Sequence, residues 1–240
     1  MIAPDVIKKL ALKYQTTELN VVREYFQHIF LQYFYRQKQS GKIYFKGGTA
    51  LRIIYQSPRF SEDLDMSSEI KNIPAIEGLA LAAVAEIERE GIKAEIKESK
   101  RTSGGYLAII HFFYNSQPIA VQIEISLRKK KASGESVTIA SDFIPPYTII
   151  QLSLDELVEE KIKALLSRKK PRDFYDIYFL LRANLISTGG KKLLTSISDV
   201  LAETKISFSK ELKIFLPKSH WPILKSFPAA LKREINRQIA

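Results

Sequence analysis

Apolar residues recur at helical spacing in the first forty positions of the chain. Their intervals predict helices over residues 4–15 and 17–39. The second of these carries the longer apolar face, made of Val21, Val22, Tyr25, Phe26, Ile29, Phe30, Tyr33 and Phe34. A further helix is expected over residues 74–90.

Short apolar runs with strand character lie between and after these helices. They predict strands over residues 43–45, 63–67, 92–97, 106–114 and 119–127, with 135–140 as a weaker candidate. A glycine pair follows the first strand, and a helix is expected to start at Thr49. The crowding of strands in residues 92–140 favours a mostly antiparallel sheet.

The segment DFIPPYTIIQ, residues 142–151, is expected to divide the chain, because paired prolines cannot continue a helix or a central strand. Beyond it, helices are predicted over residues 153–168, 172–184, 190–202, 208–216 and 228–238. The expected organisation is therefore an α/β domain over residues 1–150 and a helical domain over residues 151–240. The fold class is α+β.

Charge is distributed unevenly over a strongly basic chain of net charge +11. Residues 1–150 hold 20 basic and 16 acidic side chains, whereas residues 151–240 hold 17 and 10, so the shorter part carries the larger excess. A basic surface attracts polyanions such as nucleic acid. A solvated, lysine-rich surface that only maintains solubility is the alternative interpretation.

Composition excludes several kinds of chemistry. The chain has no cysteine, which excludes disulfides and thiolate catalysis and leaves oxygen atoms or histidine as metal ligands. No secretory signal begins the chain, and no apolar run reaches the roughly 18 residues that a membrane span needs. We expect a soluble, cytoplasmic protein without a membrane partner.

Carboxylates gather on two of the predicted strands. Asp63 and Asp65 are two residues apart on a strand, so both side chains point to the same face. In AVQIEISL, residues 120–127, apolar side chains fill one face and Glu124 lies on the other. Paired carboxylates suit magnesium, which takes oxygen ligands and substrate phosphates. A solvated strand end is the alternative explanation for the two aspartates.

The glycine pair supplies the second half of a possible nucleotide site. Gly47 and Gly48 precede a helix that begins near Thr49, and such a turn lets backbone N–H groups approach a phosphate. It is not a Walker A loop, because Lys46 comes before the glycines and no lysine follows them. A phosphate turn and metal-binding acids joined by one helix form a more specific signal than either part alone.

The helical part contributes charged residues at inward positions. Lys161 falls on the apolar stripe of the helix predicted over residues 153–168, so it either meets an anion or extends along apolar surface to reach water. Asp173 and Asp176 lie three residues apart on the next helix, where they can hold Arg168, Arg172 or a lysine. Structural ion pairing is favoured for at least one of the two aspartates.

Three segments in order resemble motifs of the AbiEii/AbiGii toxin family of nucleotidyltransferases, in the DNA polymerase β-like superfamily. They are FKGGTALRIIYQSPRFSEDLDMS at 45–67, EEKIKALLSR at 159–168 and PRDFYDIYFLL at 171–181. The resemblance implies a nucleotidyltransferase-type mixed or antiparallel sheet flanked by helices, with a helical C-terminal domain. It also implies a toxin of a toxin–antitoxin or abortive-infection system, with a cognate antitoxin as partner and the 3′ end of tRNA as acceptor.

The same resemblance implies roles for individual residues. The triphosphate of an NTP would be held by Gly47, Gly48 and Thr49, and Mg²⁺ or Mn²⁺ by Asp63 and Asp65. Lys161 would bind a phosphate, and Asp173 or Asp176 would complete the last motif. Glu124 is expected as the third metal ligand from strand parity. Arg52 and Ser61 are further candidates for phosphate contacts, with a solvated helix position and a turn cap as their respective alternatives.

Two other functions use the same residues. In one, the site holds GTP or another nucleotide as a regulatory ligand without transfer. In the other, a nucleotidyltransferase modifies a protein or a small molecule. The basic segments LRKKKASGE at 127–135 and SRKKPR at 167–172 are candidate RNA contacts, or else ordinary solvated loops.

Overall fold

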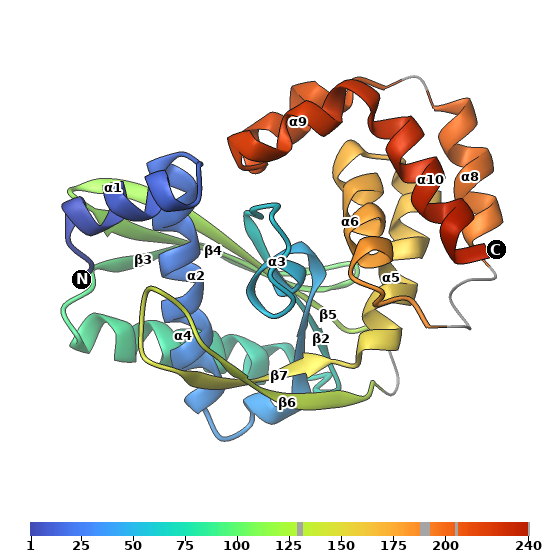
Figure 1. Ribbon diagram of the computed structural model, residues 1–240. Coiled ribbons are helices and arrows are strands. Elements are labelled where there is room, and N and C mark those ends of the chain that lie inside the picture. The colour runs from blue at the N-terminus through green and yellow to red at the C-terminus, as the bar shows by residue number, and fades with distance from the viewer. Residues whose placement is uncertain (129–131, 188–192, 205, 240) are drawn as a thin grey trace. The chain divides into compact units, whose positions relative to one another are not determined.

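The chain divides into two compact units in the computed structural model, which describes residues 1–128, 132–187, 193–204 and 206–239 (Figure 1). The first unit comprises Met1–Gln56 and Phe60–Leu152, and the second comprises Ser57–Arg59 and Ser153–Ala240. Ser57–Arg59 thus belong to the second unit, although the residues on both sides of them in the sequence belong to the first.

A seven-stranded sheet in the order β3-β4-β5-β2-β1-β7-β6 forms the centre of the first unit. Its strands are β1 (Ile43–Lys46), β2 (Asp63–Ser68), β3 (Ala94–Thr102), β4 (Gly105–Tyr114), β5 (Gln117–Ser126), β6 (Gly134–Ile139) and β7 (Tyr147–Leu152). The pairs β1–β7 and β2–β5 are parallel, and the other neighbours are antiparallel. The sheet is thus mixed. Its two parallel pairs join strands that are far apart in the sequence.

Strand β7 lies where the sequence predicts only a boundary. Pro145 and Pro146 are indeed outside regular structure, but the strand starts directly after them at Tyr147. Tyr147 and Ile149 are buried, whereas Thr148 between them is exposed, which is the alternation of a strand with one covered face. The second half of the predicted boundary segment thus forms a strand of the sheet, which the sequence analysis did not predict.

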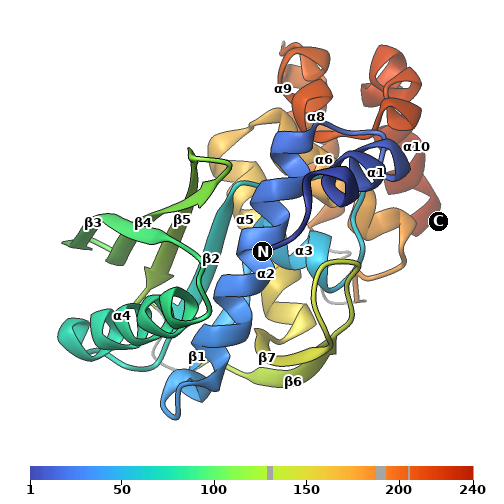
Figure 2. The same ribbon diagram turned by 90° about the vertical axis from the view of Figure 1, so that its left-hand side faces the viewer.

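Helices α2 (Glu18–Arg36) and α4 (Ile73–Arg89) cover one face of the sheet (Figure 2). They pack on each other, α2 also contacts β5 and β7, and α4 contacts β3 and β4. Helix α1 (Pro4–Lys13) packs on α2. On β5, Val121, Ile123 and Ile125 are buried beneath this layer, while Glu124 between them is exposed on the opposite face.

The short helix α3 (Gly47–Ile53) follows β1 without a linker and contacts β1 and β2. It begins at Gly47, two residues before the expected start at Thr49. Gly47 has φ of +83°, a left-handed conformation that glycine adopts without strain. The turn from strand to helix therefore takes place at this glycine.

The second unit is helical. It contains α5 (Leu154–Arg168), α6 (Pro171–Arg182), α8 (Leu194–Glu203), α9 (Phe208–Phe215), α10 (Phe227–Ile239) and the 3₁₀ turns Lys218–His220 and Pro222–Ser226. Its core includes Phe208, whose ring lies 5.5 Å from that of Phe174 and 4.8 Å from that of Phe227. Residues 190–192 of the helix predicted over 190–202 lie outside the described residues. Among the helices that the structure describes, none is long and apolar enough to cross a membrane.

Candidate active site

The glycine turn and the Asp65 carboxylate of β2 lie directly against each other in the first unit. A Cβ atom placed on Gly47 would be 2.1 Å from Asp65 Oδ2 and 2.7 Å from Asp65 Cβ. No side chain fits in that space, since real Cβ contacts below 3.0 Å essentially do not occur. The absence of a side chain at position 47 therefore allows the Asp65 carboxylate to lie on the turn.

Thr49 connects the same turn to the neighbouring acid. Its hydroxyl donates a short hydrogen bond to the backbone carbonyl of Asp63, and the residue is fully buried. The hydroxyl of Thr49 thus supports β2, and the triphosphate contact that the family resemblance implies for Thr49 stays a prediction.

The register of the sheet brings the predicted acids onto one face. Asp63 is paired with Gln122 and Asp65 with Glu124 across the parallel strands β2 and β5. Registered positions on adjacent strands lie roughly 5 Å apart and point the same way. Asp63 and Asp65 are half-buried and Glu124 is exposed, where it accepts a hydrogen bond of 2.7 Å from Gln122 Nε2.

The donor set on this face is of the kind that a hard divalent cation takes. Asp63 and Asp65 offer carboxylate oxygens beside a turn able to receive phosphate, and magnesium is commonly held by one or two carboxylates together with substrate phosphates. Within the part of the chain that the structure describes, no three His, Asp or Glu side chains are grouped closely enough to hold a metal ion on their own. The pair of aspartates fits such an ion, whereas Glu124 is near them in register without completing a cluster.

Arg52, a candidate for a phosphate contact, contacts an acid and an aromatic ring of the first unit. Its guanidinium donates to Glu24 on α2 at 2.8 and 3.3 Å and lies 3.9 Å from the centre of the Phe60 ring. Burial raises the pKa of the Glu24 carboxyl, and the charge of Arg52 and its hydrogen bond partly offset that rise. The side chain of Arg52 is only 13% exposed, so it is neither a solvated residue nor an evident phosphate ligand.

The loop before Asp63 is attached to α2 by residues that the sequence does not single out. Gln27 Nε2 donates to the carbonyls of Ser61 and Glu62, both at 3.0 Å. Arg23 Nη1 lies 3.0 Å from Glu62 Oε1. Ser61 is half-buried in this loop, and whether its hydroxyl contacts a phosphate stays a prediction.

In the second unit, a buried carboxylate joins two cations from distant parts of the sequence. Asp176 Oδ1 accepts from Arg59 Nε at 2.7 Å, and Asp176 Oδ2 accepts from Arg59 Nη2 at 3.0 Å and Lys161 Nζ at 2.7 Å. All three residues are at most 9% exposed. Burial by itself raises the pKa of Asp176, but the charges and hydrogen bonds of Arg59 and Lys161 outweigh it and lower the pKa to about 2.

This ion triad, Arg59, Lys161 and Asp176, accounts for the lysine on the apolar stripe. Lys161 meets an anion, as one of the two interpretations requires, but that anion is Asp176. A triad with two cations and one carboxylate retains one positive charge in a buried setting. Any phosphate contact of Lys161 would have to be made in addition to this bond.

Asp173 has a structural role at the start of α6. Its carboxylate accepts a hydrogen bond of 2.6 Å from Arg168 Nη2 and one of 3.3 Å from the backbone N–H of Lys170. An acid at this position satisfies an N–H group that the helix leaves unpaired. The pairing with Arg168 is one of those the sequence suggests, whereas Arg172 lies 3.7 Å from Glu211 instead.

The predicted site residues are thus divided between the units. The first unit brings together Gly47, Gly48, Asp63 and Asp65, with Glu124 on the adjacent strand, and the second unit holds Lys161, Asp173 and Asp176. Arg59 and Gln27 were missed, because each acts through a partner distant in sequence. Two sequence signals pointed toward the triad. Lys161 is predicted on the apolar stripe of its helix, and Asp176 is predicted to be able to hold an arginine or a lysine.

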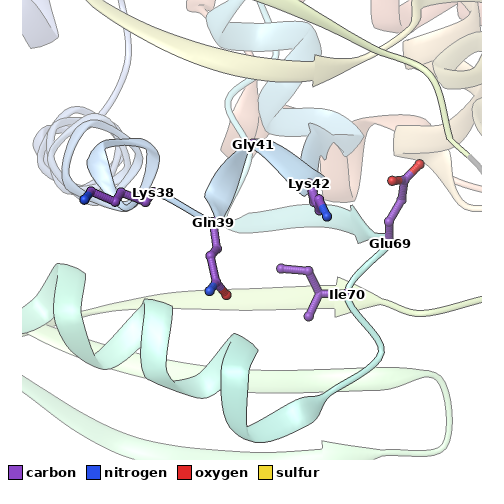
Figure 3. A pocket seen from close by; sticks show the side chains of 6 residues that line it. All are labelled: Lys38, Gln39, Gly41, Lys42, Glu69 and Ile70. Carbon is purple, nitrogen blue, oxygen red and sulfur yellow. The ribbon is translucent and has the colours of Figure 1, made fainter.

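A surface cavity of about 540 Å³ lies elsewhere on the first unit (Figure 3). Its lining comes from the turn before β1 and from the end of β2, namely Lys38, Gln39, Gly41, Lys42, Glu69 and Ile70. None of the predicted site residues is among them. This cavity therefore does not belong to the carboxylate site.

The fold is that of nucleotidyltransferases. A structure described as a nucleotidyltransferase from H. pylori matches with a TM-score of 0.68 at 18% identity, covering 93% of this chain and 96% of that one. MenT4, a nucleotidyltransferase toxin from Mycobacterium tuberculosis H37Rv, matches with a TM-score of 0.70 at 15% identity, covering 100% and 89%. JHP933 from Helicobacter pylori matches with a TM-score of 0.68 at 20% identity, covering 93% of each chain.

The sequence identifies the family. Residues 29–237 match the family described as Nucleotidyl transferase AbiEii toxin, Type IV TA system, and the chain belongs to it. A comparison with the sequences of curated proteins finds no match. Membership confirms the resemblance seen in the motifs and implies nucleotidyl transfer, a nucleotide substrate and an antitoxin partner.

Proposed function

We propose that this protein is a metal-dependent toxin that transfers a nucleoside monophosphate from an NTP to RNA, with the 3′ end of tRNA as acceptor. The observation that carries the proposal is the contact between the glycine turn and Asp65. This contact supports a site in which a backbone suited to phosphate meets a carboxylate suited to magnesium or manganese. Because NTPs and tRNA are cytoplasmic, we place the reaction in the cytoplasm.

Each part of the site has a task in this reaction. Asp63 and Asp65 would hold the metal, and the backbone N–H groups of Gly47 and Gly48 would hold the triphosphate. Mg²⁺ or Mn²⁺, when bound, supplies charge neutralisation and lowers the pKa of the acceptor hydroxyl. Glu124, one strand away, is available to the metal or to the acceptor side of the same face. The protein otherwise mainly positions the reacting groups, as in other phosphoryl transfers.

The charge of the chain supports RNA as the acceptor. The chain carries a net charge of +11, with the larger excess in residues 151–240. Ser167–Lys170 of the segment SRKKPR are exposed, which supports a contact with the phosphates of RNA. Residues 129–131 of the other basic segment, LRKKKASGE, lie outside the described residues.

The test is to incubate purified protein with each labelled NTP, Mg²⁺ or Mn²⁺, and either total tRNA or an RNA-free cell extract. We expect label in tRNA with the wild-type protein, none in the presence of EDTA, and at least a 1,000-fold slower rate for Asp63→Asn, since the residue is proposed to hold the metal. Asp5→Asn, which changes an exposed acid of α1, is the matched control and should keep the wild-type rate.

The alternatives give different results in the same experiment. Label in protein or in a small molecule, with none in tRNA, would show that the acceptor is not tRNA but a protein or a small molecule. Nucleotide binding without any labelled product would support a regulatory binding protein. Equal rates for the wild type and Asp63→Asn would contradict the metal assignment.

A further inference from the structure

Three consecutive backbone carbonyls lead into the carboxylate strand, and two helical side chains hold all of them. Gln27 donates to the carbonyls of Ser61 and Glu62 at 3.0 Å each, and Thr49 donates to the carbonyl of Asp63. Gln27 is 1% exposed and Thr49 is fully buried. Both hydrogens of the Gln27 amide are therefore used on adjacent peptide groups.

The arrangement leaves the loop little freedom next to the acid. A carbonyl shielded from water is unfavourable without a donor, so loop conformations that abandon either bond to Gln27 are disfavoured. The donor itself is on α2, whose neighbouring residues Phe26, Phe30 and Leu31 are fully buried. The position of Ser61 and Glu62 is thus set from the rigid core of the first unit.

We propose that Gln27 is a positioning residue, which fixes the backbone entering β2 and thereby the direction of the Asp63 carboxylate. The inference deepens the proposed function and rests on it, in that Asp63 is taken to serve the transfer reaction. Gln27 lies 34 residues before Ser61, and its amide donates to the loop carbonyls of Ser61 and Glu62. Its effect is exerted entirely through the loop.

Gln27→Met tests this role, because methionine has a similar length and good helix propensity but no donor. We expect kcat to fall about 100-fold, as misplacement of reacting groups by about 1 Å does elsewhere. The concentration of Mg²⁺ at half-maximal rate should rise, while KM for the tRNA acceptor stays within twofold. A change that only reduced the folded fraction would lower kcat without shifting the Mg²⁺ dependence.

Gln37→Met is the matched control. Gln37 follows the same helix, and its amide donates to the carbonyl of Tyr33 at 3.2 Å and to Glu86 Oε1 at 3.0 Å, away from the loop. It should leave kcat and the Mg²⁺ dependence unchanged. Gln27→Asn, which keeps the amide but shortens its reach, should give an intermediate effect and serves if Gln27→Met does not fold.

Amide hydrogen exchange of the peptide covering residues 57–66 separates this inference from the proposed function. Faster exchange in Gln27→Met than in Gln37→Met supports positioning, even if no acceptor is ever labelled by the wild type. Unchanged exchange, or a Mg²⁺ dependence equal to that of the wild type, would overturn the inference while leaving the transferase proposal intact.

Discussion

Two regions of this protein carry the motifs of the family, and their carboxylates are in opposite situations. In the first unit, Asp63 and Asp65 are half-buried beside a backbone turn, with Glu124 exposed on the next strand. In the second unit, Asp176 is 1% exposed and bonded to Arg59 and Lys161. The first region keeps oxygen atoms within reach of a ligand, whereas the second uses its carboxylate to hold cations.

The difference shows that membership of a motif does not by itself give a residue its role. Lys161 and Asp176 belong to the segments that resemble the family, yet each is the other's partner. The triad has an excess positive charge, and its cations are fixed in position by the shared acid. We therefore regard Asp176 as the residue that orients Arg59 and Lys161.

The largest expected effect is on the triad. Asp176→Asn keeps the shape but removes the charge of the carboxylate that Arg59 and Lys161 share in a buried position, which should cost about 3–5 kcal/mol of the free energy of unfolding. The measurement is urea denaturation followed by the fluorescence of Trp221, the only tryptophan, which lies in the second unit.

The control for this prediction is on α5. Glu159→Gln removes the charge that Lys163 meets at 2.5 Å, in a pair whose side chains are 53% and 67% exposed. Exposed pairs of this kind contribute little, so the stability of Glu159→Gln should stay close to that of the wild type. Similar losses for Asp176→Asn and Glu159→Gln would show that the triad is not the stabilising element described above.

Gly47→Ala should have the next largest effect, on activity. The new methyl group would lie 2.1 Å from Asp65 Oδ2 at a residue with φ of +83°, so the acid must move away from the turn. We expect kcat for nucleotidyl transfer to fall about 100-fold, the scale of loss that a displacement near 1 Å produces.

Gly78→Ala provides the comparison for this variant. Gly78 is within α4, and a Cβ there meets no atom within 4 Å, so alanine should stabilise the helix by about 0.5–1 kcal/mol and leave the rate unchanged. A Gly47→Ala protein with the wild-type rate would mean that the turn and Asp65 do not act together.

Much of the fold could be predicted from the sequence, because periodicity reports local burial. The strand parity that places Glu124 opposite Ile123 and Ile125 is confirmed by their burial, and so is the inward position of Lys161. Strand β7 was missed, because its neighbour β1 is about a hundred residues away and the preceding prolines obscured it.

The supporting residues of the site could not be predicted, since their roles arise only from tertiary contacts. Arg59 is 117 residues from Asp176, and nothing in the local sequence distinguishes it from a solvated arginine. Gln27 likewise interrupts an apolar pattern without any recognisable motif. Polar side chains buried on α2 become informative only once their partners are known.

Mild acid should destabilise the first unit before the second. Burial, with a smaller contribution from the charge of Arg52, lowers the pKa of His28 to about 3, so between pH 6.5 and 3 the unfolded chain binds a proton that the folded chain does not. The free energy of unfolding then falls by about 1.4 kcal/mol per pH unit, or about 2 kcal/mol from pH 6.5 to 5. The stabilisation by Asp176 is present above the unfolded pKa, near 3.9, and is lost only as the pH falls toward 2.

Urea denaturation followed by far-UV circular dichroism at pH 7 and pH 5 measures this difference. The raised pKa of Glu24 acts in the opposite direction, because the folded state takes up that proton first, and it reduces the slope at low pH. His28→Asn, which keeps a polar group without titration, should lose most of the dependence. An unchanged slope in that variant would assign the effect to other groups.

The smallest expected effect distinguishes a structural role of Arg52 in the first unit from a role in binding phosphate. Arg52→Lys keeps the positive charge but loses the double contact with Glu24 and the stacking on Phe60, which should reduce stability by about 1–2 kcal/mol. KM for the NTP should stay within twofold of the wild type, because the guanidinium is engaged in the core of the first unit. A rise in KM of tenfold or more with unchanged stability would restore Arg52 to the phosphate site.

Lys163→Met is the control, because it removes an exposed positive charge from α5 and so measures the effect of a change in surface charge alone. The comparison of the two units then rests on Arg52 as much as on Arg59, because both are arginines that a carboxylate holds in place.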